Sequence, residues 1–309
     1  MPALEYDAII IGSGPAGLTA GSLLSRAGHR TLLLERDVHG GALQHVDRID
    51  DYPPYAGGIS GADLASVLID AASANGLLLE QADAAGVEVF SRSRWVATTQ
   101  GRGFSCGVVI VAGGARFRSL GLPSEDRLRG RGLIDCTPCD AGFYANKRVI
   151  VVGSDDYALR DALHLAGEGA LVTLLAPANQ LEAGPRWLAS ALEAEHIDLC
   201  YGACVESIVG HDRVEGVVYT AAGRQQQLAA AGVAIRLGTE PNTEWLTYLL
   251  ELDADKRVPV NVELETEAQF VLAAGDIRSG SRLGVAGAVA DGQSVAATAM
   301  ELLGRLAAG

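Results

Sequence analysis

Positive charge and aromatic side chains are both scarce in this chain of 309 residues. Lys and Arg together number 24 against 38 Asp and Glu, which gives a formal net charge of −14 and a sequence pI of about 4.8. Binding to nucleic acid needs clustered Lys and Arg, and the nearest approach to a cluster, at residues 127–131, is too short to supply it. Nucleic acid is therefore not an expected partner.

Long apolar runs are also lacking. No run has the length of a membrane span, and the N-terminus leads into an expected strand rather than a basic and then apolar leader. These absences predict a cytoplasmic protein, whose thiols stay reduced. The five cysteines are an odd number, unsuited to a framework of structural disulfides. We expect three of them, Cys106, Cys200 and Cys204, to be small buried core residues.

One dinucleotide-binding signature is complete. An expected buried strand runs into the sequence GSGPAG at 12–17, and an apolar helix follows. Gly12 makes the tight turn, Gly14 lets the backbone approach a pyrophosphate, and Gly17 allows helix and strand to pack closely. The next strand ends at Glu35, whose carboxylate can accept a hydrogen bond from a ribose hydroxyl. The sequence therefore predicts a nucleotide site here.

A second strand–turn–helix–strand unit lacks the chemistry of the first. Its first strand, expected at 148–152, leads into a turn in which Asp155 holds the position of the middle glycine. A carboxylate there adds bulk and negative charge where a pyrophosphate would sit. Residues 176–180, where a 2′-phosphate would need arginine, contain no cation. We expect this unit to keep the fold without the usual nucleotide.

Strands and glycine-marked turns alternate with apolar helices, which indicates an α/β fold with parallel sheets. The predicted architecture is two Rossmann-like dinucleotide-binding domains, the second inserted into the first. Residues 1–114 and 240–309 would form the first domain, and residues 115–239 the inserted one, which carries a CxxC motif.

The CxxC motif consists of Cys136 and Cys139 and is followed by Asp140. This spacing lets two sulfurs bridge and lowers the pKa of one thiol. A zinc site would need a second pair of ligands, for which Cys200 and Cys204 are poorly spaced, so no metal site is predicted. A redox role is favoured. Asp140 is the natural acid or base for the thiolate proton, or a helix cap, or both.

Over almost its whole length the sequence resembles the low-molecular-weight thioredoxin reductases. The segment at 121–140 is the most specific, because it joins the loop before the cysteines to CxxCD in the order of that family. The matching segments are GSGPAG at 12–17, GGALQHVDRIDDYP at 40–53, GISGADL at 58–64, GLPSEDRLRGRGLIDCTPCD at 121–140, NKRVIVVG at 146–153, TEPNT at 239–243 and AAGDI at 273–277.

The resemblance implies FAD at the first site, with Asp276 near the ribityl chain and pyrophosphate, a homodimer, and electron exchange between CxxC and the flavin. In that scheme Cys139 faces the isoalloxazine, Cys136 reacts with the outside substrate and Asp140 handles the proton. The implied cofactor-binding residues are Gly12, Gly14, Pro15, Ala16, Gly17, Glu35, Gly41, Leu43, Asp51, Gly113, Gly275, Asp276 and Val285.

The chain departs from the pattern of the family mainly at the NADPH site. The family has glycine at Asp155, a His-Arg-Arg run at 176–178 and a later arginine at Glu182. Two departures lie near the flavin, where Asn-aromatic-Pro becomes Asp-Tyr-Pro at 51–53 and a glutamine becomes Ala42. FAD is therefore expected and NADPH is not.

We expect an FAD-dependent thiol/disulfide oxidoreductase that takes electrons from a donor other than NADPH, such as a ferredoxin or an unknown donor. Its partner would be a thioredoxin-like protein or a small-molecule dithiol or disulfide. One alternative is an FAD-dependent dithiol oxidase that passes electrons to oxygen, although such oxidases commonly carry His where this chain has Asp140. A second is a non-catalytic flavoprotein for binding or sensing, which would not need both cysteines and Asp140.

Overall fold

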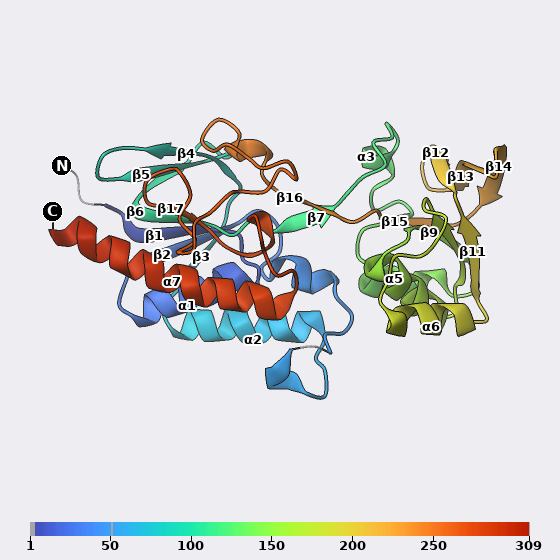
Figure 1. Cartoon of the computed structure of the whole chain (residues 1–309), viewed down its shortest axis with the longest axis horizontal. Helices are drawn as coiled ribbons and strands as arrows, with labels where there is room; N and C mark the ends of the chain where they lie inside the picture. Colours follow the sequence, from blue (N-terminus) through green and yellow to red (C-terminus); the bar gives the residue numbers. More distant parts are fainter. Residues whose placement is uncertain (1–3, 51, 309) are drawn as a thin grey trace. The chain divides into compact units, whose positions relative to one another are not determined.

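The computed structural model describes residues 4–50 and 52–308, which divide into two compact units. The larger unit contains the residues up to Arg116 and from Glu240 onward, and the smaller unit is Phe117–Thr239. The chain crosses between them through β7 (Ala115–Phe117) and β16 (Thr239–Pro241), two short strands that pair with each other (Figure 1).

A parallel sheet in the order β3-β2-β1-β6-β17 forms the centre of the larger unit. Ile9 of β1 pairs with Leu32 of β2 on one side and with Val109 of β6 on the other. Such runs of buried aliphatic residues are typical of strands covered on both faces. The strands are β1 (Tyr6–Ile11), β2 (Thr31–Glu35), β3 (Leu78–Gln81), β6 (Gly103–Val111) and β17 (Val271–Ala273).

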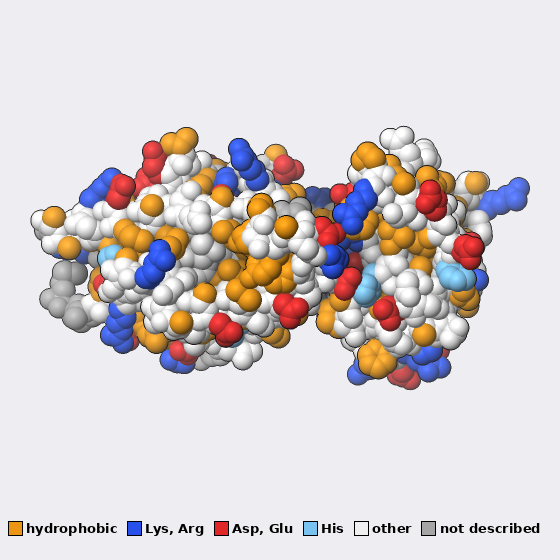
Figure 2. Space-filling model, turned by 90° about the horizontal axis from the view of Figure 1, so that it is seen from below, with side chains coloured by type: hydrophobic (Ala, Val, Ile, Leu, Met, Phe, Trp, Pro, Cys, Tyr) orange, Lys and Arg blue, Asp and Glu red, His pale blue; other side chains and the backbone are white. Residues whose placement is uncertain are grey.

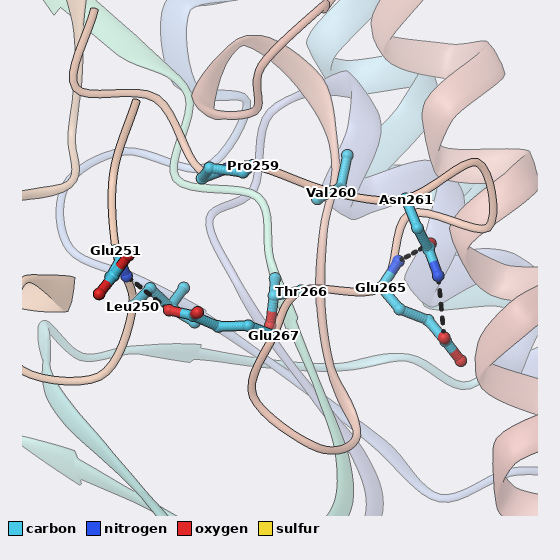
Figure 3. Close-up of a pocket in the computed structure, with 8 residues that line it drawn as sticks. All are labelled: Leu250, Glu251, Pro259, Val260, Asn261, Glu265, Thr266 and Glu267. Atoms are coloured by element: carbon cyan, nitrogen blue, oxygen red, sulfur yellow. Dashed lines mark hydrogen bonds between the residues drawn. The ribbon is translucent and has the colours of Figure 1, made fainter. Parts of the chain in front are cut away.

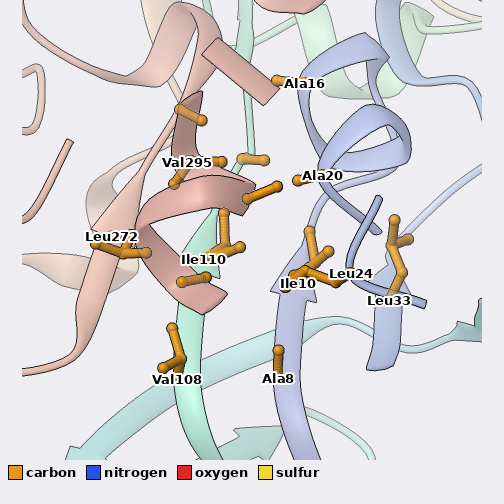
Figure 4. Packing of buried hydrophobic residues seen from close by; sticks show 14 of the residues in the cluster. Ala8, Ile10, Ala16, Ala20, Leu24, Leu33, Val108, Ile110, Leu272 and Val295 are labelled. Carbon is orange, nitrogen blue, oxygen red and sulfur yellow. The ribbon is translucent and has the colours of Figure 1, made fainter. Parts of the chain in front are cut away.

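Three helices, α1 (Pro15–Arg26), α2 (Gly61–Ala74) and α7 (Val285–Ala308), cover one face of this sheet (Figure 1). Figure 4 shows the core between helices and sheet, where small residues such as Ala16 and Ala20 face larger aliphatic ones. A Cβ on Gly292 of α7 would lie 2.5 Å from the carbonyl oxygen of Ala16. The abundance of small residues thus allows α1 and α7 to pack closely.

The opposite face carries an antiparallel layer that the α/β alternation did not indicate. β4 (Ala84–Val89) pairs with β5 (Arg94–Thr98), and β5 pairs with the first part of β6 (Figure 1). The side chain of Arg94 is fully buried there. Its guanidinium donates to the carbonyls of Gln269 (3.0 Å) and Gly107 (3.2 Å) and lies 4.3 Å from the centre of the Phe270 ring.

The smaller unit also contains a parallel sheet, in the order β11-β10-β9-β15-β8, and an antiparallel sheet in the order β12-β13-β14. The two units are thus Rossmann-like and the second is inserted in the first, which confirms the predicted fold class. The elements are β8 (Leu133–Ile134), β9 (Arg148–Gly153), β10 (Leu171–Ala176), β11 (Ile197–Tyr201), β12 (Cys204–Val209), β13 (Gly216–Ala221), β14 (Arg224–Ala229), β15 (Gly232–Arg236), α3 (Glu125–Leu128), α4 (Thr137–Asp140), α5 (Asp156–Gly167) and α6 (Pro185–Glu193).

The three cysteines outside CxxC differ in burial. Cys106 is buried in β6, as predicted, and this burial raises the pKa of its thiol to about 12. Cys200 is half-buried in β11. Cys204 is exposed at the start of β12, so the prediction of a buried residue is wrong there. β12 is an edge strand with alternating burial, and Cys204 lies on its solvent side.

Acidic and basic side chains are interspersed over the face of each unit seen in Figure 2. Among the residues that the structure describes, no helix has both the length and the apolar character needed to cross a membrane.

Candidate functional site

The first glycine loop requires glycine at two positions for reasons internal to the fold. Gly12 has a φ of 105°, and a Cβ there would lie 2.4 Å from the carbonyl oxygen of Ala112. A Cβ on Gly17 would lie 2.0 Å from the carbonyl oxygen of Gly12. Any larger residue at either position would therefore displace the strand, the turn or α1.

Gly14 lies in open space instead. It has a φ of −69°, and a Cβ there would meet no atom within 4 Å. Gly14 is also the N-cap of α1, and no side chain caps this helix, which begins at Pro15. The first backbone N–H groups of a helix need an acceptor, and the helix dipole favours an anion. The end of α1 is thus open to a phosphate group.

A buried serine fixes the loop to the end of β2. The hydroxyl of Ser13 donates to Glu35 Oε2 (2.6 Å) and accepts from the N–H of Gly40 (3.0 Å). The N–H of Ser13 also donates to Glu35 Oε2 (2.8 Å), and the N–H of Asp37 donates to Oε1 (3.0 Å). Glu35 therefore orders its own loop. A carboxylate has about four acceptor positions, so Glu35 keeps capacity for a ribose hydroxyl.

The turn after β17 lies beside the open end of α1. Gly275 has a φ of 78°, and a Cβ there would lie 3.1 Å from the Cβ of Ala16. Its N–H donates to Asp291 Oδ2 (2.9 Å). Arg278 donates to both oxygens of Asp291 at 2.6 Å, and these two side chains are only 14% and 11% exposed. This buried ion pair ties the turn that carries Asp276 to α7.

The pKa of Asp276 is affected by burial and by neighbouring polar and charged groups. Burial raises the pKa of its carboxyl, while the hydroxyl of Ser281 and the charge of Arg257 act in the opposite direction. Asp291 adds a smaller contribution that also raises the pKa. A carboxyl in such surroundings is suited to hydrogen bonding with a ligand hydroxyl.

The structure brings most of the predicted cofactor residues to one place. A Cβ on Gly41 would lie 3.3 Å from the Cα of Gly14, and one on Gly12 would lie 3.0 Å from the Cα of Gly113. Leu43 is buried in a small cluster that Val285 contacts. Asp51 lies outside the described residues.

The CxxC motif forms a disulfide at the start of α4. The Cα atoms of Cys136 and Cys139 are 5.3 Å apart, and the N–H of Cys139 donates to the sulfur of Cys136 (3.2 Å). Cys136 is buried and Cys139 is exposed. A reaction of Cys136 with an outside substrate therefore requires that Cys136 become exposed.

Asp140, the last residue of α4, is half-buried. Burial and the neighbouring charge of Asp135 raise the pKa of its carboxyl. Its side chain makes no capping hydrogen bond to the 3-10 helix that follows. Its side chain is therefore not a cap of that helix, and its role as an acid or base for the thiols stays a prediction.

The second glycine loop differs from the first at the helix end. Asp155 is the N-cap of α5, and its Oδ1 accepts from the N–H of Ala158 (3.0 Å). Asp156 accepts from the N–H of Gly184 (2.7 Å), and the carbonyl of Ser154 accepts from the N–H of Glu182 (2.7 Å). The N–H that a phosphate would bind is thus held by a carboxylate of the chain itself.

A cavity of about 500 Å³ in the larger unit matches none of the predicted site residues. Figure 3 shows Glu251, Glu265 and Glu267 around it. Glu267 accepts from the N–H of Glu251 (2.6 Å), and Asn261 donates to Glu265 (3.1 Å). Across residues 4–50 and 52–308, no His, Cys, Asp and Glu side chains are grouped as a metal site.

Two Rossmann-like units and a bridged CxxC define a class of disulfide oxidoreductases that bind a dinucleotide. The family model for pyridine nucleotide-disulphide oxidoreductases matches residues 6–298, and the chain belongs to this family. It is 30% identical over 299 residues to the thioredoxin reductase of Bacillus subtilis. This match covers 96% of this chain and 94% of the relative. The thioredoxin reductase of Listeria monocytogenes is 33% identical over 291 residues, and this match covers 93% of this chain and 90% of the relative.

The crystal structure of thioredoxin reductase from Lactococcus lactis has a TM-score of 0.91 to this chain at 30% identity. The match covers 97% of this chain and 100% of that one. The chain is accordingly an FAD-dependent disulfide oxidoreductase of the thioredoxin reductase type. The open helix end at Gly14 and the adjacent Asp276 fit this cofactor.

Replacing Gly14 with leucine tests the cofactor site. Because a Cβ at Gly14 would meet no atom of the protein within 4 Å, the variant should fold normally and lose most of its FAD. Flavin released from equal amounts of denatured protein measures the loss, and circular dichroism measures the fold. Gly167→Leu is the matched control, since a Cβ there also lies in open space. A Gly14→Leu protein with a full complement of FAD would contradict the assignment.

Proposed function

We propose that this chain is a thiol/disulfide oxidoreductase whose Cys136–Cys139 pair exchanges electrons with FAD that is not reduced by NADPH. The main observation behind the proposal is the contrast between the N-termini of two helices, each of which follows a strand and a glycine loop. The N-terminus of α1 is uncapped and open beside Gly14, whereas that of α5 is capped by Asp155. The electron donor would be a ferredoxin or another reduced carrier, and the homodimer and the cytoplasmic location stay predictions.

The thiol chemistry is supported by the groups around the disulfide. When bound, FAD supplies a carrier of two electrons that suits exchange with a dithiol. The N–H of Cys139 stabilises negative charge on the sulfur of Cys136 after the bond opens. Asp140, with its raised pKa, holds a proton to higher pH than an ordinary aspartate and can pass it to the departing thiolate.

The argument against NADPH is electrostatic. Two like charges about 4 Å apart cost about 4 kcal/mol at an effective dielectric constant of 20. Asp155 would oppose a pyrophosphate in this way, and it already satisfies the N–H of Ala158. The arginines absent from 176–178 remove charge-assisted hydrogen bonds of about 1.5–3 kcal/mol each. Together these losses weaken binding by several powers of ten.

We therefore predict that NADPH and NADH reduce the flavin poorly even at millimolar concentration. The measurement is anaerobic stopped-flow mixing that follows the visible absorbance of the flavin. Dithionite serves as the positive control, because it shows that the flavin is reducible in the same sample. Bleaching by either nicotinamide within the time of ordinary turnover would refute the prediction.

The thiols are tested by reducing the flavin with dithiothreitol under anaerobic conditions. We expect Cys136→Ser and Cys139→Ser to slow this reduction at least tenfold, because neither variant can form the disulfide that relays the electrons. Cys204→Ser, which removes an exposed thiol elsewhere in the smaller unit, is the matched control and should keep the wild-type rate. A double Cys136→Ser, Cys139→Ser variant with the wild-type rate would rule the relay out.

A basic cavity whose lining includes residues close in sequence to CxxC supports an acidic protein as the thiol partner. This cavity of about 810 Å³ lies in the smaller unit and includes Phe143 and Tyr144, which belong to the 3-10 helix that follows α4. The ring of Phe143 is 71% exposed. In a chain of net charge −14 the cavity gathers four cations around one acid, Glu215. The cations are Arg131, Lys147, Arg148 and Arg213.

Exposed aromatic rings flanked by cations are typical of protein-docking sites, and charge complementarity speeds association. We therefore propose a thioredoxin-like protein as the partner, with this cavity as its docking site. A small disulfide would reach the thiols without using the cavity.

Phe143→Ala should slow the reduction of a thioredoxin by the pre-reduced protein about tenfold, which corresponds to about 1.4 kcal/mol. The rate with a small aromatic disulfide should not change, because that substrate needs no docking surface. Phe90→Ala, which removes an exposed ring from the larger unit, is the matched control. An equal loss of rate with both substrates, or no loss with thioredoxin, would contradict this docking site.

A further inference from the structure

A buried arginine bonds to residues within and beside the CxxC motif. Arg236 is the last residue of β15, and its side chain is 4% exposed. Its Nε donates to Asp161 Oδ2 of α5 (2.5 Å). The hydroxyl of Thr137, within the CxxC motif, donates to the same carboxylate oxygen (2.6 Å). The ion pair and the motif are thus joined through one shared carboxylate oxygen.

The guanidinium also bonds to the residues on both sides of Cys136. Nη2 donates to the carbonyl of Asp135 (3.0 Å) and to the hydroxyl of Thr137 (3.1 Å). Nη1 donates to the carbonyl of Ile235 (2.8 Å). Arg236 therefore bonds to the residue before Cys136 and to the residue after it.

An aromatic ring covers the guanidinium. The ring of Phe117 lies 4.3 Å from the guanidinium carbon and is itself in edge contact with Tyr157 at 5.3 Å. A buried charge that has a counter-ion, several acceptors and an aromatic cover has one favourable position, because moving it would leave a charge without partners. The carbonyl of Asp135 and the hydroxyl of Thr137, which bond to Arg236, are therefore also held in place.

The bonds of Arg236 to Asp135 and Thr137 affect the stability of the Cys136–Cys139 disulfide because they lie on either side of Cys136. The stability of a disulfide depends on how closely the folded chain keeps its two reduced sulfurs together. Cys139 belongs to α4, whereas Cys136 precedes that helix and is positioned by its neighbours. Bonds to Asp135 and Thr137 therefore keep Cys136 at bridging distance from Cys139 in the reduced state.

We propose that Arg236, held by Asp161, is a positioning residue that fixes Cys136 against Cys139 and so stabilises the active disulfide. The proposal rests on the proposed function in that it assumes the pair to be redox-active. Without Arg236 the reduced sulfurs separate more freely, and the disulfide becomes easier to reduce. A purely electrostatic role would act in the opposite direction, because a cation stabilises the thiolate of the reduced state.

The test is the equilibrium of the full-length flavoprotein with anaerobic mixtures of reduced and oxidised dithiothreitol. Each reduction breaks the Cys136–Cys139 bond and closes one in dithiothreitol, which supplies both electrons and both thiol protons. Alkylation followed by mass spectrometry of the peptide that contains both cysteines gives the fraction reduced. We expect Arg236→Met to reach half-reduction at about a tenfold lower ratio of reduced to oxidised dithiothreitol, a shift of about 30 mV.

Two further variants make the result decisive. Arg224→Met, which removes an exposed arginine from β14 of the same unit, should leave the equilibrium unchanged. Thr137→Val keeps the buried shape, removes one bond to Arg236, and should shift the equilibrium in the same direction by a smaller factor. If Arg236→Met does not fold, Thr137→Val decides in its place.

An equilibrium equal to wild type in the deciding variant overturns the proposal, and so does a shift toward a more stable disulfide. The measurement involves no turnover of the flavin. If the thiols do not exchange electrons with FAD but the expected shift is found, the proposed function fails and the role of Arg236 stands.

Discussion

The ligand chemistry of both units depends on which group satisfies the first N–H groups of the helix that follows a glycine loop. In α1 no side chain does so, and the space beside Gly14 is open. In α5 the same geometry is completed by Asp155, which accepts from Ala158. The strand, the turn and the helix are alike in the two units, so the difference lies in one side chain, which accepts a hydrogen bond that a ligand phosphate could otherwise accept. Burial raises the pKa of Asp155, a sign that this carboxylate is held partly out of water.

In each unit a largely buried arginine–aspartate pair lies near the carboxyl end of the parallel sheet. Arg278 and Asp291 fix the turn with Asp276, and Arg236 and Asp161 fix the turn with the disulfide. The carboxyl ends of strands are where open α/β sheets bind and transform ligands. Removing two charges from water is costly, and such pairs add little stability over apolar residues of the same size. Their value here lies in holding nearby polar backbone in one arrangement.

The sequence could predict what depends on local spacing. Gly12, Gly14 and Gly17 follow a strand at fixed intervals, and CxxC brings two sulfurs together within four residues, so the fold class and the disulfide could be inferred. The bonds of Ser13 to Glu35 and of Arg236 to Asp161 join residues 22 and 75 positions apart, and no local pattern indicates them. The antiparallel strands β4 and β5 were missed because short amphipathic strands carry a weaker signal than the buried parallel ones. The burial predicted for Cys204 was wrong, because at an edge strand burial depends on which face of the strand packs against the core.

The fold of the second unit has a structural role, because it positions the residues around the disulfide. Its parallel sheet supplies β15, whose last residue, Arg236, bonds to the carbonyl of Asp135 and the hydroxyl of Thr137 on either side of Cys136. Its helix α5 supplies both Asp155, which closes the phosphate position, and Asp161, which orients Arg236. A nucleotide domain whose phosphate position is filled by its own carboxylate needs no ligand to order α5. The same helix can then serve as a rigid support for the disulfide, so the proposed loss of NADPH binding is compatible with retention of the thiol pair in one fold.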